Sequence, residues 1–385
     1  MSDIKESALK VEKWVEDHSY KGYDPADGLT SYLRPLTFGN LFLDRCLQQL
    51  VWRSPINIRP ILGVKPKASF IARGYMAWGY LTRYKTTNDE NYRRKAIECL
   101  EWLKTNKAPG YKDYSWGKTH DFASRSGRQG KFEPITIWTS LIGFAFLEAY
   151  EITKDKKHLQ VAESICNWIL NVPRNQTSSG FCINYTPKDD GSCTIHNQSM
   201  VAAAMLAKTY KHTGNKGFLE IAGEAMKYSC TRQQPDGSWF YGEGPTWHWI
   251  DNFHTGYNLD ALKCYIENTG DKKYEDNLKK GFDFFKNNFI EPTGRPKYYH
   301  NRAYPIDSQC ISQSIETLAN FSEYDPTSLE LALKVAKWAI NNMQDKTGYF
   351  YYAKYPMFTL KTPLIHWAQA TTYKALGLLI AKLNS

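Results

Sequence analysis

The sequence predicts an all-α fold in which six helical hairpins form one closed ring. Three observations lead to this prediction: a helix–break–helix pattern recurs along the chain, a lone helix pattern ends it, and a matching lone helix pattern begins it. With 385 residues the chain is long enough for one large domain or two ordinary ones. The recurring pattern favours a single domain over residues 1–385.

Five short polar breaks mark the repeat, and each follows an apolar helical pattern. The breaks are centred on Asp89, Asp155, Asn215, Asp271 and Asp325. A large aromatic residue lies 13 positions after each break, at Trp102, Trp168, Tyr228, Phe284 and Trp338. The first helix of each unit is the more apolar and is expected to face inward. A Gly-containing turn and an aromatic strand-like stretch follow the second helix, so short β-like hairpins are expected at one rim.

The two chain ends are predicted to close the ring together. The helix pattern at residues 367–383 matches the first helix of a unit, and the chain ends where the second should begin. Residues 8–14 (ALKVEKW) nearly repeat residues 332–338 (ALKVAKW), which belong to a second helix. The N-terminal helix therefore supplies the missing partner. Residues 18–66, which include a helix near 41–51, are then an insertion.

This pattern resembles the six-hairpin (α/α)6 toroids, a fold shared by many glycosidases, N-acylglucosamine 2-epimerases, several polysaccharide lyases and the helical part of glucuronyl C5-epimerases. Three stretches also resemble an uncharacterised family associated with polysaccharide biosynthesis. They are DGSWFYGEGPTWHWIDNFHTGYNLDAL, KYYHNRAYPIDSQC and DKTGYFYYAKY. The resemblance covers most of the chain and implies the fold and the biological context. No catalytic residue is taken from it.

Composition points to an anionic partner that contains sugar rings. Aromatic residues make up 15% of the chain, and the formal net charge is +10. Aromatic rings suit stacking on sugars, and the charge favours an acidic oligo- or polysaccharide or an anionic membrane surface. The chain contains no run of five or more Lys or Arg residues, so a nucleic-acid-binding tail is not expected. No apolar stretch approaches the roughly 18 residues that a membrane span needs. The oligomeric state is left open.

The remaining motifs favour a cytoplasmic protein without a cofactor. The eight cysteines are scattered without a CxxC pair, which predicts reduced thiols, and the N-terminus has no signal-peptide core. There is no GxGxxG after a strand, no Walker sequence and no GxSxG. His248, Asp251 and His254 straddle a helix start, but their spacing matches no known metal site, so no metal is predicted.

The candidate site centres on residues 234–260, where aromatic and ionisable residues crowd the start of an inner helix. Because all inner helices begin at one end, matching positions of other units are expected to converge there. The catalytic candidates are His254, Tyr241, Asp251, His300, Tyr304, Asp307 and Glu243. The substrate-binding candidates are Trp116, Arg125, Arg128, Tyr185, Trp239, Trp247, Tyr298, Tyr299, Tyr351 and Trp367.

Three functions suit this rim. The first is proton abstraction at C5 of a uronate, leading to epimerisation or β-elimination. His254 would be the base, because a helix N-terminus disfavours a protonated ring. The opposing group would be Tyr241, Tyr304 or His300, with Asp251 or Asp307 orienting a partner.

The second function is glycoside hydrolysis by paired carboxylates, for which Glu243, Asp251 and Asp307 are the candidates. The third is glycan binding without catalysis. For Asp251 and Asp307 the sequence allows a purely structural role as well, because each directly precedes an inner helix and can cap it.

Overall fold

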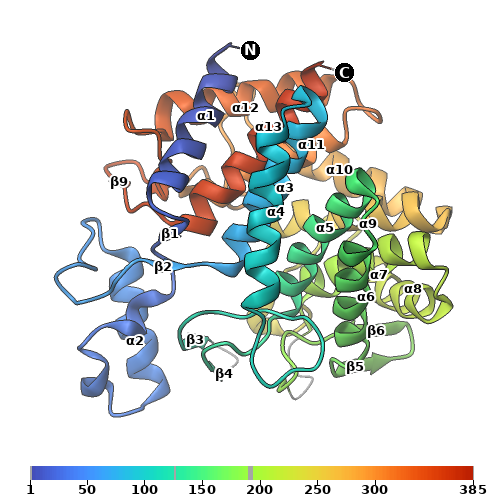
Figure 1. Cartoon of the computed structure of the whole chain (residues 1–385), viewed down its shortest axis with the longest axis horizontal. Helices are drawn as coiled ribbons and strands as arrows, with labels where there is room; N and C mark the ends of the chain where they lie inside the picture. The colour runs from blue at the N-terminus through green and yellow to red at the C-terminus, as the bar shows by residue number, and fades with distance from the viewer. Residues whose placement is uncertain (1, 125–126, 190–193, 385) are drawn as a thin grey trace.

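The computed structural model describes residues 2–124, 127–189 and 194–384 (Figure 1). In this part of the chain six inner helices form a ring. They are α3 (Phe70–Thr87), α5 (Thr136–Thr153), α7 (His196–Thr213), α9 (Asn252–Thr269), α11 (Ser308–Asn320) and α13 (Thr371–Asn384), which a π-helical segment (Ile365–Ala370) precedes. Each packs on the next inner helix along the chain, and α13 packs on α3. The predicted ring is confirmed.

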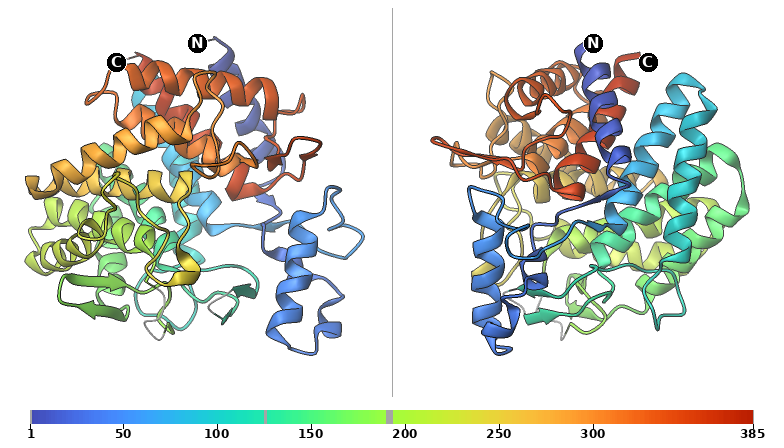
Figure 2. Two further views of the ribbon diagram at one scale, coloured as in Figure 1. Left: turned by 180° about the vertical axis from the view of Figure 1, so that it is seen from behind. Right: turned by 60° about the vertical axis from the view of Figure 1, so that its left-hand side comes forward.

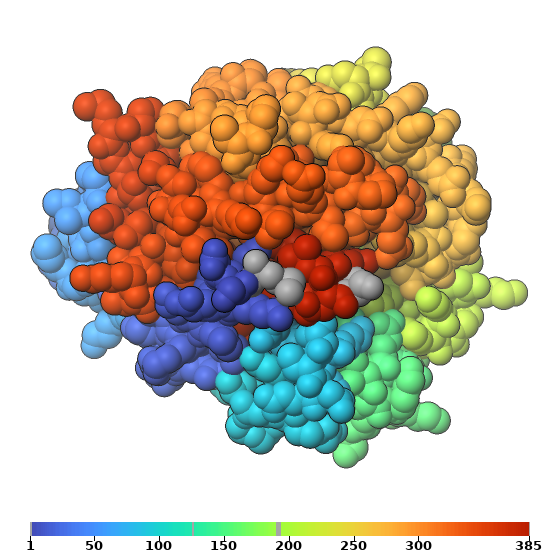
Figure 3. Space-filling model, turned by 90° about the horizontal axis from the view of Figure 1, so that it is seen from above, coloured from blue at the N-terminus to red at the C-terminus, as the bar shows by residue number. Residues whose placement is uncertain are grey.

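Within the described residues, six outer helices cover the ring. They are α1 (Ser2–Asp17), α4 (Glu90–Thr105), α6 (Lys156–Leu170), α8 (Lys216–Cys230), α10 (Glu275–Phe289) and α12 (Thr327–Met343). Each of the last five packs on the inner helix that precedes it. The first helix, α1, instead packs on α12 and α13, and Figure 3 shows the N-terminal and C-terminal segments side by side. Tyr373 Oη donates a hydrogen bond of 3.1 Å to Glu12 Oε2 across this contact.

The turn glycines show that α1 occupies a regular outer position. Four of them have positive φ values and approach the backbone of an outer helix closely. A Cβ atom on Gly180, Gly237 or Gly294 would lie within 2.5 Å of the backbone of α8, α10 or α12. A Cβ on Gly348 would lie 2.6 Å from the Lys10 carbonyl oxygen in α1. Only glycine fits such an approach, so α1 closes the ring in the same way as the helices inside it.

The polar breaks are helix caps. The side chains of Asp89, Asp155 and Asn215 accept hydrogen bonds from the backbone amides at the starts of α4, α6 and α8. Asp271 does the same for a short 3-10 turn (Lys272–Tyr274) before α10. Such caps satisfy amides that no helix residue can reach. The recurrent Asp or Asn of the sequence therefore has a structural cause.

Small antiparallel sheets lie at the end of the ring where the inner helices begin, as predicted. They pair β3 with β4 (Phe122–Ser124, Gly127–Gln129), β5 with β6 (Arg174–Thr177, Gly180–Ile183), and β8 (Ala353–Lys354) with β7 (Ile306–Asp307) and β9 (Thr359–Leu360). In the β5–β6 hairpin Arg174 pairs with Ile183 and Thr177 with Gly180. A further pair, β1 (Lys21–Gly22) with β2 (Lys67–Ala68), closes the base of the predicted insertion.

Residues 18–66 lie beside the ring, where Figures 1 and 2 show them as a separate lobe around α2. The lobe contains two 3-10 turns (Asp27–Thr30, Arg34–Thr37) and α2 (Leu41–Arg53). A small core of its own holds it together, formed by Leu29, Leu47 and Val51 against Ala123. The predicted helix at 41–51 is thus present. All seven described cysteines are free thiols, and Cys46 on α2 is exposed.

Candidate functional site

A cavity of about 820 Å³ opens at the end of the ring where the inner helices begin. Rim segments, inner-helix starts and α2 line it. Seven sequence-predicted residues contribute: Tyr241, His254, Arg128, Tyr185, Trp247, Tyr298 and Trp367. The rim therefore brings together groups from five connections between helices, as the ring closure requires.

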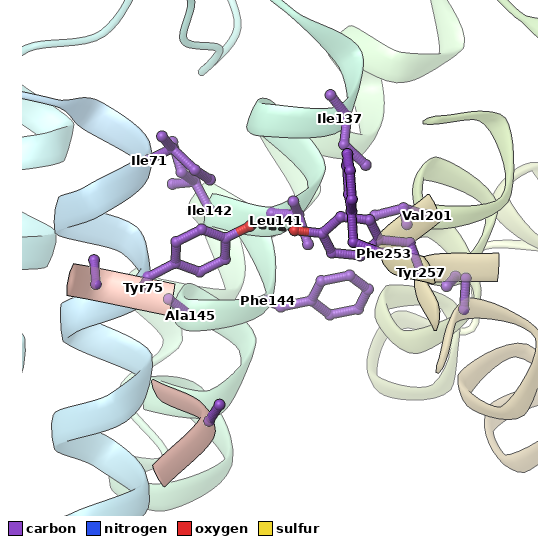
Figure 4. Close-up of a cluster of buried hydrophobic side chains, with 14 of the residues drawn as sticks. Ile71, Tyr75, Ile137, Leu141, Ile142, Phe144, Ala145, Val201, Phe253 and Tyr257 are labelled. Carbon is purple, nitrogen blue, oxygen red and sulfur yellow. Dashed lines mark hydrogen bonds between the residues drawn. The ribbon is translucent and has the colours of Figure 1, made fainter. Parts of the chain in front are cut away.

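Two tyrosines close the bottom of this cavity. Tyr75 on α3 and Tyr257 on α9 meet across the centre of the ring with their hydroxyl oxygens 2.9 Å apart (Figure 4). Gln309 Nε2 donates to Tyr257 Oη at 2.7 Å. Leu141 and Tyr257 also line a second cavity of about 190 Å³ beyond this layer. Leu141 and Tyr257, which line both cavities, form a septum between them.

His254 stands on the cavity wall with a buried carboxylate behind it. Its Nδ1 lies 2.7 Å from Asp251 Oδ2, and the other Asp251 oxygen accepts the His254 backbone amide at 3.1 Å. Trp249 Nε1 donates to the same Oδ2 at 2.8 Å. A carboxylate accepts hydrogen bonds, so Nδ1 carries a proton, and in the neutral ring Nε2 is then the acceptor. Asp251 is both helix cap and imidazole partner.

Aromatic rings enclose this imidazole. Its centroid lies 4.3 Å from that of Tyr241 and 3.9 Å from that of Phe253. Tyr241 in turn stacks on Trp249 at 4.5 Å. The structure thus places Tyr241 on the same wall as His254, beside it and not across from it. These faces offer a sugar a stacking surface directly next to the imidazole.

A second polar cluster lies on the other side of the cavity, around Asp24. Asp24 is buried, with Lys118 Nζ 3.3 Å and His366 Nδ1 3.2 Å from its carboxylate oxygens. Burial alone would raise the pKa of Asp24, but the charges of Lys118 and His366 outweigh it and hold the pKa well below its usual value. Burial also lowers the pKa of His366, against the pull of Asp24.

The position of this cluster relative to His254 follows from the ring order. The Trp138 ring at the start of α5 and the His366 ring meet at 5.2 Å, beside the start of α3. In a ring of six, α3 and α9 lie opposite each other, so the cluster faces His254. Sequence analysis missed Asp24. It lies in the insertion, and nothing local in YDPADG shows that the ring brings it to His366 and to His120, whose Nε2 lies 3.6 Å from Asp24 Oδ1.

The helix α2 adds cations to the mouth. Five of its residues line the cavity, at spacings that place them on one side of the helix: Arg45, Gln48, Gln49, Trp52 and Arg53. Sequence analysis missed these as well. Their i, i+3, i+4, i+7, i+8 spacing was the available signal, although it does not reveal what the side faces.

Glu243 belongs to a different contact and does not line the cavity. His196 Nε2 lies 2.8 Å from its Oε1, and Arg232 Nε lies 3.6 Å from its Oε2. Burial opposes ionisation of Glu243, yet the hydrogen bond and charge of His196 and the charge of Arg232 lower its pKa. A carboxylate held ionised in this way suits a structural pair.

Asp307 caps α11 and is also outside the cavity lining. Its Oδ1 accepts from the Gln309 amide at 2.7 Å and from Trp367 Nε1 at 2.8 Å. Burial raises the pKa of Asp307 to about 7, although these hydrogen bonds pull it down. Asp307 therefore fixes the Trp367 ring, which does line the cavity.

The other predicted residues lie elsewhere. Trp116 and Trp239 are core residues whose indole nitrogens donate to the carbonyls of Leu103 and Ser229. Four more are not among the residues that line the cavity: Tyr299, His300, Tyr304 and Tyr351. Arg128 lines it and pairs with Asp44. Arg125 lies outside the described residues.

The ring, its rim hairpins and its polar, aromatic cavity define a six-hairpin (α/α)6 toroid of the type found in carbohydrate-active enzymes. A family model, the Ulvan lyase N-terminal domain, matches residues 189–348, which include Asp251 and His254. No curated protein sequence matches the chain.

Solved structures share the fold. The cellobiose 2-epimerase from Bacillus thermoamylovorans is similar with a TM-score of 0.66 and 13% identity, over 83% of this chain and 90% of that one. An unsaturated glucuronyl hydrolase specific for heparin gives 0.64 and 12%, over 99% and 96%. The GH76 alpha-mannanase from Bacteroides thetaiotaomicron gives 0.62 and 12%, over 82% and 86%. The predicted resemblance to six-hairpin enzymes is confirmed for the fold.

Proposed function

We propose that this protein acts on an acidic oligo- or polysaccharide by abstracting the C5 proton of a uronate, with His254 as the base. One observation carries the proposal. A buried carboxylate, Asp251, binds Nδ1 of an imidazole whose ring lines the large cavity at the rim. The role in polysaccharide metabolism and the cytoplasmic location predicted from the sequence belong to the same proposal.

The chemistry follows from the tautomer. Nδ1–H donates a hydrogen bond to Asp251 and keeps its proton, so Nε2 offers its lone pair to the C5 proton. The electrons of the broken C–H bond move into the sugar carboxylate, which becomes enolate-like. In epimerisation a proton returns to C5 from the other face. In β-elimination the C4–oxygen bond breaks, a C4–C5 double bond forms, and the leaving oxygen takes a proton.

The cavity supplies charge for the intermediate. Lys118 lies on the wall opposite His254, and Arg45 and Arg53 line the mouth. A cation near a developing carboxylate dianion stabilises it most where water is excluded. Of these three cations, Lys118 has the most defined position, because Asp24 pairs with its ammonium group and the Trp138 ring lies 4.4 Å from its Nζ. The matching family model bears the name of a lyase, which favours elimination within this proposal.

The hydrolase alternative has weaker support. Its candidate carboxylates, Asp251, Asp307 and Glu243, are each bound to other side chains, and none lines the cavity. A glycosidase needs two carboxyl groups beside the scissile bond. The cavity does hold Glu133 and Asp189, so the experiment must be able to detect hydrolysis.

The test is incubation with oligouronates in D₂O. Deuterium at C5 of recovered sugar, seen by NMR, supports abstraction, and ultraviolet absorbance of a 4,5-unsaturated end identifies elimination. New reducing ends with saturated products and no C5 exchange would establish hydrolysis instead. Binding measured by calorimetry without any turnover would leave a glycan-binding protein.

A further inference from the structure

The lobe formed by residues 18–66 carries most of the exposed apolar surface. Of the 13 large hydrophobic side chains exposed among the described residues, nine lie between residues 32 and 61. The most exposed include Leu36, Phe38, Phe42, Leu50, Ile56 and Ile61; Phe38 is 86% exposed and Ile56 74%. We call these six the apolar face. A patch of this size on one segment marks an interaction surface.

The helix α2 shows that this exposure is ordered. One side is buried in the lobe, with Asp44, Leu47 and Val51, and a second side lines the cavity. The third side carries Phe42, Leu43 and Leu50, at spacings that form one stripe towards solvent. The helix therefore has a separate apolar stripe beyond what its own core and the cavity use.

Neighbouring segments extend the stripe. The turn with Leu36 packs on α2, and Phe38 follows it directly. Tyr32 Oη donates a hydrogen bond to the Ile61 carbonyl, which joins the segment before α2 to the segment after it. The lobe projects beside the ring in both views of Figure 2, so its outer side is accessible.

The charges of the lobe have one sign at its surface. Residues 18–66, all described, contain no Glu and three Asp, and every Asp is buried. Asp24, Asp27 and Asp44 pair with Lys118, Arg59 and Arg128. The exposed charged residues of the segment are cations, Lys21, Arg53 and Lys65. The lobe surface thus combines large apolar side chains with positive charge.

From this combination we propose that the apolar face docks the protein on an anionic lipid bilayer. Apolar side chains enter the headgroup boundary while the exposed cations of the lobe contact anionic headgroups. A second copy of this chain is a poorer occupant, because both copies carry the same net charge of +10 and repel each other. No helix in the described residues is long and apolar enough to cross a membrane, so the attachment is at the surface.

Docking would also orient the cavity. Trp52 and Arg53 line the cavity on α2, next to the stripe that contains Leu50. The mouth would then lie beside the bilayer surface. A glycan attached to or emerging from that surface would reach the rim without the protein leaving the membrane.

The experiment is vesicle flotation of the full chain with phosphatidylcholine alone and with phosphatidylcholine plus phosphatidylglycerol. Wild-type protein is expected to float with the anionic vesicles, and less so as salt rises. The triple variant Phe38→Ser/Phe42→Ser/Leu50→Ser should bind about tenfold more weakly or worse. Met357→Ser/Phe358→Ser, which removes exposed apolar side chains elsewhere, should bind as wild type does.

Three results would overturn the proposal: no flotation of wild type with anionic vesicles, equal loss in the control variant, or a wild-type dimer that the triple variant converts to monomer. The last would identify a second copy as the occupant. Circular dichroism checks that the variants fold. If the triple variant does not, Phe38→Ser alone must show the weakening, since this side chain makes the fewest demands on packing.

Discussion

Two histidine–carboxylate pairs stand at the starts of neighbouring inner helices, and their exposure is reversed. In the first pair His196 on α7 is 1% exposed and its partner Glu243 is 34% exposed, at 2.8 Å. In the second, His254 on α9 is 17% exposed and its partner Asp251 is fully buried, at 2.7 Å. Both contacts join an imidazole to a carboxylate, but the carboxylate is the more exposed partner in the first pair and the imidazole in the second.

The difference shows what each pair can do. Where the carboxylate is exposed, the imidazole is buried against Ser229 Oγ at 3.1 Å and has no free edge for a substrate. Where the carboxylate is buried, the imidazole faces the cavity with Nε2 as its acceptor. A histidine–carboxylate pair therefore does not by itself indicate a catalytic base. The imidazole can act as one only where the carboxylate is buried and the imidazole faces the cavity.

The largest expected effect separates the two histidines. His254→Ala should lower turnover of an acidic oligosaccharide by roughly two to four orders of magnitude, the usual size of general acid–base catalysis. His196→Ala, the matched control, should cost stability and leave turnover per folded molecule within about tenfold. Steady-state kinetics corrected for folded fraction provide the measurement. Equal losses in both variants would remove the distinction between the pairs.

The role of the buried carboxylate can be isolated with Asp251→Asn. The amide can still cap the helix, but its NH₂ can donate to Nδ1 and place the proton on Nε2, the wrong nitrogen for a base. Turnover should fall about tenfold or more, with KM nearly unchanged, since the ring stays in place. An unchanged kcat would show that Asp251 acts only as a helix cap.

The third inner helix in this series, α11, has a carboxylate without a histidine. Burial raises the pKa of Asp307 to about 7, so the folded protein keeps a proton that the unfolded chain, with a pKa of about 3.9, releases. Wild-type stability from this group is complete below about pH 4 and is lost as pH rises towards 7.

Asp307→Asn should therefore gain stability relative to wild type between pH 5 and 7, by up to about 1.4 kcal/mol per pH unit, and level off above. Chemical denaturation at several pH values measures this. Asp325→Asn is the control: the hydrogen bond from Lys286 lowers the pKa of Asp325, so its effect should be constant over this range. A flat Asp307→Asn difference would contradict the burial argument.

Glu243→Gln should affect stability more than turnover. Loss of the charged hydrogen bond to His196 should cost about 1 kcal/mol at pH 7, a modest value because the carboxylate is partly exposed. The lowered pKa of Glu243 means that this contribution exists above about pH 4 and fades as pH falls further. Thermal melts at pH 7 and pH 3.5 test both points. Loss of turnover would favour hydrolysis with Glu243 as the acid.

The smallest effect concerns the cations that α2 contributes to the cavity lining. Arg45→Ala should weaken binding of an acidic oligosaccharide about two- to fivefold and reduce its salt dependence, since a partly exposed contact is screened. Lys279→Ala, on the outer surface of α10, should have no effect. Calorimetric titration at low and high salt provides the comparison, and identical affinities for neutral and acidic sugars would contradict the charge argument.

The repeat was readable because its causes are local. Caps such as Asp89 and turn glycines such as Gly237 satisfy backbone requirements that recur in every unit, so their spacing survives in the sequence. The ring closure could be predicted for the same reason, because residues 8–14 nearly repeat the outer-helix residues 332–338.

The site was only partly readable because its causes are not local. The rim candidates His254 and Trp367 lie on inner-helix starts, where the repeat expects them, and both line the cavity. Whether an aromatic residue lines a cavity or fills the core depends on tertiary packing, which is why Trp116 could not be distinguished from Trp247. Asp24 reaches the cavity-lining residues Lys118 and His366 through the path of an insertion that has no counterpart in the repeat.

The septum formed by Leu141 and Tyr257 has a consequence for how a polymer can be handled. An enzyme that threads a chain through itself and works processively needs an opening at both ends. Here the ring is blocked one layer below His254, so whatever enters by the rim must leave by it. A glycan that reaches His254 cannot be drawn through the ring, and each encounter ends with release through the same mouth.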